Sequence, residues 1–319
     1  MRRTFALIAA WLALAAPAAA FGPLIEVADL EARLAAADGS ETALPGLPDL
    51  VIDIRNPRAF AAGHIPGAVN APYARWRGPR ENPGRVPSEA DLEALLGGIG
   101  ASPEMAVLIV HAGRNPTEFG AAARVYWTLK SAGFGQLAIL NGGAEAWTVA
   151  GGTLETGEGV SRPLQVDVTL SREWWIDADG VADVVDGSSP AVLLDARPLA
   201  FFEGDRKHGA AAEAGTLAGA LNIVHSTWFA SGGPFMEAPA EMIARIQAIA
   251  AENADRPLVS FCNTGHWAAT NWFAASELAG VEGAVRVLGR DRLNASNHLR
   301  RRLHEGTARG EPGRMDDVE

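Results

Sequence analysis

The stretch from Val51 to Tyr73, VIDIRNPRAFAAGHIPGAVNAPY, sets a pattern that the chain uses twice. An apolar run ends in Asp53-Ile54-Arg55, and after a short segment the chain continues as Gly63 to Asn70, GHIPGAVN. In the second half, Val192 to Arg197 (VLLDAR) and Gly215 to Asn222 (GTLAGALN) follow in the same order. Each half therefore contains an apolar strand, Asp-x-Arg, a loop and Gly-x-x-x-Gly-Ala-x-Asn, which predicts two modules of one design.

Strand-like and helix-like segments alternate along both halves. Short aliphatic runs are separated by stretches that suit helices and end at glycine. This alternation predicts an α/β fold, with a parallel β-sheet flanked by helices in each half. Beyond the repeated motifs, the expected strands are 107–110, 137–140, 258–261 and 285–288, and the expected helices are 121–132 and 268–279.

The chain divides into four parts. Residues 1–20 hold two arginines, an apolar run and Ala18-Ala19-Ala20, the pattern of a cleaved bacterial export signal, so we expect a periplasmic protein. That apolar run is shorter than the roughly 20 residues that span a bilayer, and we expect no membrane association after cleavage. Residues 21–155 form the expected N-terminal module and 164–305 the C-terminal one, joined through a Gly, Thr, Glu and Ser segment. Residues 306–319 are polar and Gly-rich, which predicts a flexible tail.

Composition and charge limit the class of partner. The chain is 48% hydrophobic and 20% charged, which is typical of folded domains. Its formal net charge is −11, and loss of Arg2 and Arg3 with the signal makes it −13. Such an acidic protein is unsuited to nucleic acid or anionic lipid. A small anionic substrate needs a local positive potential.

Cys262 is the only cysteine, and it lies in the stretch FCNTGHWAAT. Exported proteins usually hold cysteines in pairs, so a lone one is buried and inert, linked to another molecule, or reactive. A strand ending at Phe261 and a helix starting near Trp267 leave a short loop, where backbone N–H groups and the helix dipole favour an anion. The cysteine there would be a stabilised thiolate, which is the nucleophilic form. Such a site needs no metal and no cofactor.

Two other kinds of site are disfavoured. A phosphatase of related architecture needs an arginine six positions after its cysteine to clasp a phosphoryl group, and Ala268 stands there. The segment Cys262 to Trp267 is too short and uncharged for a phosphoryl group. The seven histidines show no ligand spacing, so the sequence offers no metal site.

These motifs together resemble the tandem-domain rhodanese family of sulfurtransferases. VIDIRNPRAFAAGHIPGAVNAPY and LAILNGGAEAW resemble two of its signatures, and Cys262 stands at its active-site position. The resemblance implies two rhodanese-like domains, the second catalytic, with a sulfane sulfur carried as a persulfide on Cys262. The first module has no cysteine, and its loop, from about His111 to Gly120, is expected to be some four residues longer. It therefore resembles the family's inactive partner domain.

The substrate pocket implied by the resemblance includes Arg197 of Asp195-x-Arg197, whose alternative role is a salt bridge within the domain. The loop side chains Asn263 and Thr264 can donate hydrogen bonds to a sulfonate or carboxylate, and His266 adds charge at mildly acidic pH. The full set of expected substrate-binding residues is Arg197, Asn263, Thr264, Gly265, His266 and Trp267. This loop matches neither the thiosulfate nor the 3-mercaptopyruvate pattern of the family.

The sequence thus predicts a sulfurtransferase. A sulfane donor, with thiosulfate as the first choice and 3-mercaptopyruvate as the alternative, would sulfurate Cys262, and cyanide or a thiol would accept the sulfur. A second hypothesis is a non-enzymatic persulfide carrier that serves a dedicated protein acceptor. A third is a structural tandem module with an inert thiol.

Overall fold

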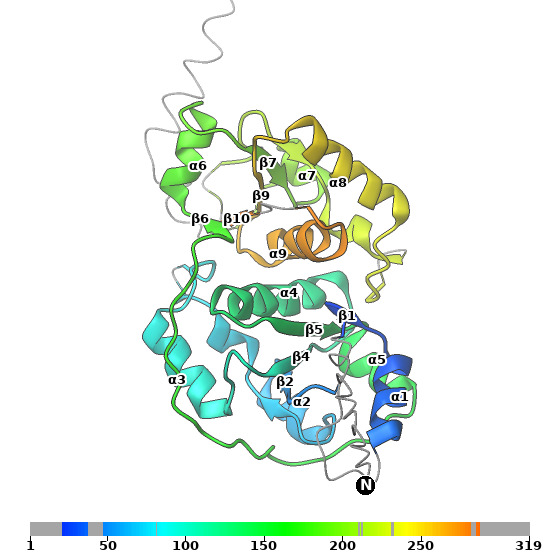
Figure 1. Ribbon diagram of the computed structural model, residues 1–319. Helices are drawn as coiled ribbons and strands as arrows, with labels where there is room; N and C mark the ends of the chain where they lie inside the picture. The colour runs from blue at the N-terminus through cyan, green and yellow to red at the C-terminus, as the bar shows by residue number, and fades with distance from the viewer. Residues whose placement is uncertain are drawn as a thin grey trace, which may run out of the picture.

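The computed structural model describes residues 21–37, 47–80, 82–209, 211, 213–230 and 233–281, and the backbone of 285–287. The expected export signal, residues 1–20, and the expected tail, residues 306–319, lie outside the described residues. Two α/β domains are stacked end to end, as Figure 1 shows. None of the helices in these described ranges is both long and apolar enough to cross a membrane.

The first domain is built on a five-stranded parallel sheet in the order β1-β5-β4-β2-β3. Its strands are β1 Leu24–Ile25, β2 Leu50–Asp53, β3 Val69–Asn70, β4 Ala106–Val110 and β5 Gln136–Leu140. Its helices are α1 Val27–Ala37, α2 Pro57–Ala62, the 3-10 helix η1 Tyr73–Trp76, α3 Glu89–Ile99, α4 Pro116–Ser131 and α5 Gly143–Val149. Strand β4 is central and wholly buried, because its run AVLIV has no polar residue.

The second domain repeats this arrangement, with the parallel order β6-β10-β9-β7-β8. Its strands are β6 Trp175–Ile176, β7 Val192–Asp195, β8 Leu221–Asn222, β9 Leu258–Phe261 and β10 Val285–Val287. Its helices are α6 Ala178–Val185, α7 Leu199–Phe202, the 3-10 helix η2 His225–Trp228, α8 Ala240–Glu252, α9 His266–Phe273 and the π-helical turn η4 Ala274–Leu278. The matching strand orders confirm the prediction of two α/β modules of one design.

Both long helices that follow the central strands begin earlier than the sequence predicted. Helix α4 starts at Pro116 instead of Ala121, because the Asn115 side chain accepts from the N–H groups of Thr117 and Glu118 and Pro116 suits the first helical position. Helix α9 starts at His266 instead of Ala268. The expected long loop from His111 to Gly120 was therefore wrong, since its second half is the first part of α4.

Helices α4 and α9 lie against each other at the boundary between the domains (Figure 1). A Cβ atom added at Gly120 of α4 would come within 2.9 Å of the His266 carbonyl oxygen at the start of α9. Large apolar side chains from both helices join one buried core: Phe119, Tyr126, Trp127, Trp272 and Phe273. The two modules therefore share one continuous apolar core across their boundary.

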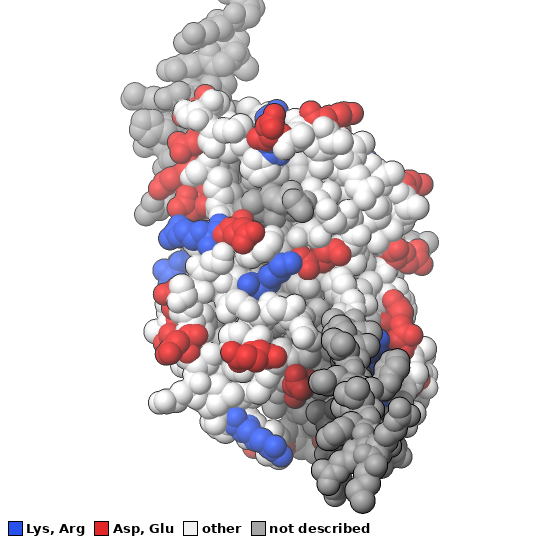
Figure 2. All heavy atoms as spheres, viewed as in Figure 1, with Lys and Arg blue, Asp and Glu red and all other residues white. Residues whose placement is uncertain are grey.

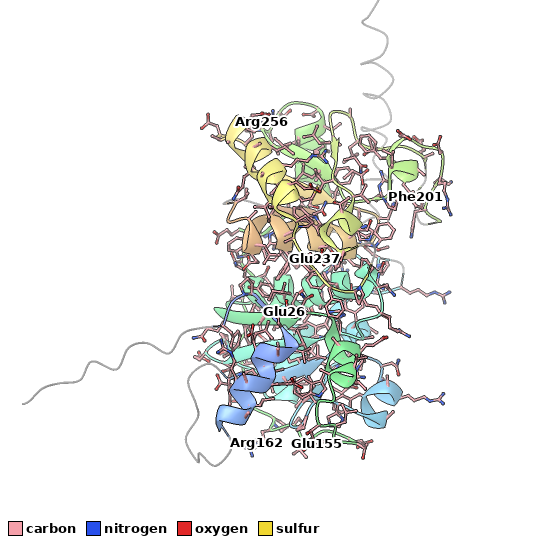
Figure 3. All side chains as sticks on the ribbon, turned by 90° about the vertical axis from the view of Figure 1, so that its right-hand side faces the viewer. Glu26, Glu155, Arg162, Phe201, Glu237 and Arg256 are labelled. Carbon is pink, nitrogen blue, oxygen red and sulfur yellow. The ribbon has the colours of Figure 1, made fainter. Side chains whose placement is uncertain are left out.

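The connection between the modules runs round the outside of the first domain before it enters β6 (Figure 1). Glu155 pairs with His64 through a backbone bridge, and the Leu164 N–H donates to the Gly97 carbonyl oxygen at 2.9 Å. Glu155 and Arg162 lie at the far end of the first domain from the second (Figure 3). The Gly, Thr, Glu and Ser segment that joins the modules, residues 151–163, is therefore bound to the surface of the first domain.

Candidate active site

Cys262 directly follows β9, the central strand of the second sheet. Its thiol is free and partly exposed, and Sγ accepts a hydrogen bond from the Gly265 N–H at 3.1 Å. Gly265 has φ 92°, a left-handed conformation that glycine adopts without strain. The loop can therefore turn within four residues from the strand into α9.

The start of α9 gives this loop its chemistry. The first N–H groups of an α-helix have no partner within the helix, and the helix dipole places partial positive charge there. Sγ of Cys262 already accepts from the N–H of Gly265, the residue that precedes α9. The arrangement stabilises negative charge on sulfur, both on a thiolate and on the terminal sulfur of a persulfide.

Two neighbours of Cys262 face the first domain. The Nδ1 atom of His266 lies 3.4 Å from the Tyr73 hydroxyl oxygen and 3.5 Å from Thr264 Oγ1. Trp267 stacks on His225, with ring centroids 4.6 Å apart, and its Nε1 donates to Thr117 Oγ1 at 3.2 Å. The cysteine loop therefore lies at the domain interface, and residues of the module without a cysteine border it.

Asn263 places its side-chain oxygen in a buried position, where it has no hydrogen-bond partner among the described residues. A buried polar atom without a partner lowers the free energy of unfolding. The unpaired oxygen of Asn263 therefore suggests that a hydrogen-bond donor is supplied by the bound substrate. The roles of Asn263, Thr264, Gly265, His266 and Trp267 in substrate binding stay predictions, although all five lie in one loop with Cys262.

Arg197 is engaged within its own domain. Its Nε and Nη2 donate to the Asp195 carboxylate at 2.9 and 2.5 Å, and Nη2 also donates to the Gly215 carbonyl oxygen at 2.8 Å. Arg55 makes the same bonds to Asp53 and the Gly63 carbonyl oxygen. This repetition in a module without a thiol supports the alternative role, a salt bridge that pins the loop; substrate contact by Arg197 stays a prediction.

In the first module, His111 occupies the place of Cys262, since it directly follows the central strand β4. Burial lowers the pKa of His111 to about 4, against the opposing effects of the Glu118 carboxylate and the Leu140 carbonyl. A cavity of about 500 Å³ at this end of the sheet is lined by residues that include His111, Arg55, Arg114, Glu118 and Glu145. Without a thiol, this cavity has no nucleophile for sulfur transfer.

Sequence reasoning missed three residues of the first module: Tyr73, whose hydroxyl approaches His266, Arg77, which lies over the Tyr73 ring, and Arg124, whose charge interacts with Cys262. One signal was available: Arg124 interrupts the apolar run Ala121 to Trp127, AAARVYW, within the expected helix 121–132. A charge inside such a run is rare without a function or a partner.

Two buried histidines predict how stability depends on pH. Burial lowers the pKa of His225 to about 4, against the Ala196 carbonyl, as it does for His111. In the unfolded chain both take up a proton near pH 6.5, and in the folded chain only near pH 4. Between these values the free energy of unfolding should therefore fall as pH falls, by up to about 1.4 kcal/mol per pH unit for each histidine.

Urea unfolding at pH 7, 6 and 5 measures this slope. A double variant, His111→Gln with His225→Gln, should flatten the slope. A wild-type stability that does not change between pH 6.5 and 5 would contradict the assignment of both histidines as neutral in the fold.

Comparison with known proteins agrees with this architecture. The family model for the rhodanese-like domain matches the chain twice, over residues 32–150 and 178–290. A protein named thiosulfate sulfurtransferase from Pseudomonas aeruginosa is 30% identical over 282 residues, which cover 83% of this chain and 90% of the relative.

Two solved structures share the fold. The 3-mercaptopyruvate sulfotransferase SseA from Escherichia coli superposes with a TM-score of 0.63 at 20% identity, covering 84% of this chain and 98% of that one. A variant of EanB, in complex with ergothioneine covalently linked with a cysteine persulfide, superposes with a TM-score of 0.69 at 18% identity, covering 86% of this chain and 68% of that one.

Proposed function

Since the chain belongs to the rhodanese-like family and its relative from Pseudomonas aeruginosa is named a thiosulfate sulfurtransferase, we propose that it transfers a sulfane sulfur through a persulfide on Cys262. One observation carries the proposal: the Cys262 Sγ lies at the end of the central strand and accepts from the N–H of Gly265, directly before α9. The site supplies stabilisation of an anionic sulfur and uses backbone groups to do so.

We propose thiosulfate as the donor, because a relative that is 30% identical is named thiosulfate sulfurtransferase. The Cys262 thiolate attacks the outer sulfur of thiosulfate, a new S–S bond forms, and the old S–S bond breaks with its electron pair leaving on sulfite. Cyanide or a thiolate then attacks the outer sulfur of the persulfide, and the Cys262 thiolate is restored. No oxidant or reductant is consumed, and the negative charge that moves between sulfurs stays beside the start of α9.

We further propose that the reaction takes place in the periplasm. Residues 1–20 have the pattern of a cleaved export signal, so the mature protein would begin at about Phe21. Acidic side chains are spread over both domains on the face in Figure 2, which fits small-molecule chemistry better than binding to nucleic acid.

Intact-mass spectrometry tests the transfer. The protein should gain about 32 Da, one sulfur, after incubation with thiosulfate and lose it again on addition of cyanide. Loading from 3-mercaptopyruvate and not from thiosulfate would replace the donor and keep the mechanism. No adduct from thiosulfate, 3-mercaptopyruvate or polysulfide would overturn the proposed function.

The alternative function, a persulfide carrier for a dedicated protein acceptor, is favoured by one feature. The segment from Asn263 to Gly265 carries no charged side chain, and Arg197 is bound to Asp195. A carrier would show loading at Cys262 with negligible turnover between thiosulfate and cyanide, so turnover measured beside the mass shift separates the two functions.

A further inference from the structure

Among the described residues, Arg124 is a fully buried cation with no carboxylate partner. It lies on α4 of the first domain and is 0% exposed. Its Nη2 donates to the carbonyl oxygens of Gly84 and Arg85 at 2.8 and 3.1 Å. Its Nε and Nη1 have no hydrogen-bond partner among the described residues. Buried guanidinium groups are normally paired with an anion, so the Arg124 guanidinium lacks the anionic partner that its burial calls for.

Arg124 lies on the face of α4 that packs against the start of α9. Gly120 and Arg124 are four residues apart and therefore share one face of the helix. Gly120 lies against the carbonyl oxygen of His266, the first residue of α9 after the loop that begins at Cys262. On the same side, the Tyr73 hydroxyl approaches His266 Nδ1, and the Arg77 guanidinium lies 5.4 Å from the centre of the Tyr73 ring.

The charges of this group interact. Burial lowers the pKa of Arg124 to about 10, while Tyr73 and Cys262 raise it and Arg77 lowers it. At neutral pH Arg124 is therefore still a cation. The coupling to Cys262 also works in the other direction, because a cation that is stabilised by a thiolate stabilises that thiolate equally.

We propose that Arg124 is the positioning cation of the Cys262 site, supplied across the domain interface by the module that has no thiol, and that it selects anionic sulfur donors. It acts through its charge on the Cys262 thiolate and on the oxyanion end of a donor such as thiosulfate, with Arg77 as a second, less buried positive charge. The proposal rests on the proposed function for the identity of the donor. It explains how a cysteine loop without its own arginine or lysine binds an anion in a protein of net charge −11.

A purely structural role for Arg124 is the competing explanation, since Nη2 holds the segment at Gly84 and Arg85. Paired alkylating reagents distinguish the two roles without any sulfur donor. Iodoacetate is an anion and iodoacetamide is neutral, so the ratio of their rate constants at Cys262 reports the local positive potential. As Cys262 is the only cysteine, each reagent reports on this thiol alone.

The Arg124→Met variant should lower the ratio of iodoacetate to iodoacetamide rate constants at Cys262 by about tenfold. Arg124→Lys keeps the charge and should retain most of the ratio. The control is Arg75→Met, which removes an exposed cation on η1 of the same domain and should leave the ratio unchanged. A folded Arg124→Met protein with the wild-type ratio would overturn the proposal.

If Arg124→Met does not fold, the partly buried Arg77→Gln decides in its place, and an unchanged ratio in that variant would likewise overturn the proposal. The thiosulfate concentration that gives half-maximal loading should also rise about tenfold in Arg124→Met. Failure of the wild-type protein to load sulfur with any donor would end the proposed function. The alkylation ratios would still test the role of Arg124, because they do not depend on sulfur transfer.

Discussion

A Cys262→Ser variant will not gain the sulfur adduct of about 32 Da from any donor, and its turnover of thiosulfate with cyanide will fall to background. Serine fills the same space, but its hydroxyl does not ionise near neutral pH and forms no stable persulfide. The chain has no second cysteine that could take over the sulfur. The expected effect is therefore complete loss and not a graded reduction.

The variant should otherwise be native. Cys262 Sγ makes one hydrogen bond, from Gly265 N–H, which a serine oxygen can also accept, so the melting temperature should stay close to that of the wild type. Thr227→Ala, an exposed change on η2 of the same domain, serves as the matched control and should load normally. Sulfur that remains bound to Cys262→Ser after gel filtration would place the carrier atom elsewhere and refute the persulfide mechanism.

The fold was largely predictable because the sequence states it twice. The strands at Val192–Asp195 and Leu258–Phe261 follow from short, mostly apolar runs, as expected for strands that are buried on both faces. The Asp-x-Arg and Asn motifs make the same hydrogen bonds in each module. The side-chain amides of Asn70 and Asn222 each donate to backbone carbonyl oxygens of the Asp-x-Arg segment in their own module. Repetition of this kind can be recognised without coordinates.

The first residues of helices α4 and α9, and the residues that the first module brings near Cys262, could not be predicted from the repeated motifs. The start of α4 depends on the Asn115 cap and on Gly120, which looks like a helix breaker in the sequence but is required by the close approach to His266. The contribution of Tyr73 and Arg124 depends on how two distant parts of the chain pack. A motif search within one module cannot find residues that a second module brings to the loop.

Removal of Glu277 should strongly destabilise the contact between the two domains. Glu277 lies in the π-helical turn that continues α9, and its carboxylate accepts from Lys130 Nζ at 2.6 Å and from the Tyr126 hydroxyl at 2.8 Å, both on α4. Its side chain is only 9% exposed. Burial and the Glu277 carboxylate together raise the pKa of Tyr126, so its hydroxyl remains a donor at all working pH values. This is the one ion pair between the domains among the described residues.

The Glu277→Ala variant should lose about 3 kcal/mol of unfolding free energy, because it leaves Lys130 and Tyr126 without their acceptor beside the rings of Trp174 and Trp272. Glu277→Gln keeps an acceptor for Tyr126 and should lose less, about 1 to 2 kcal/mol. Arg114→Ala is the control, since it breaks an exposed pair with Glu118 within the first domain and should cost less than about 1 kcal/mol.

Urea unfolding followed by tryptophan fluorescence measures all three variants, because Trp127, Trp174 and Trp272 lie at the interface. The same variants separate stability from chemistry. At a urea concentration where Glu277→Ala is still folded, the iodoacetate to iodoacetamide ratio at Cys262 should fall if loosening the interface moves Arg124 away from the loop, and Arg114→Ala should not change it. A Glu277→Ala protein as stable as Arg114→Ala would show that apolar packing of α4 on α9 holds the modules together without this ion pair.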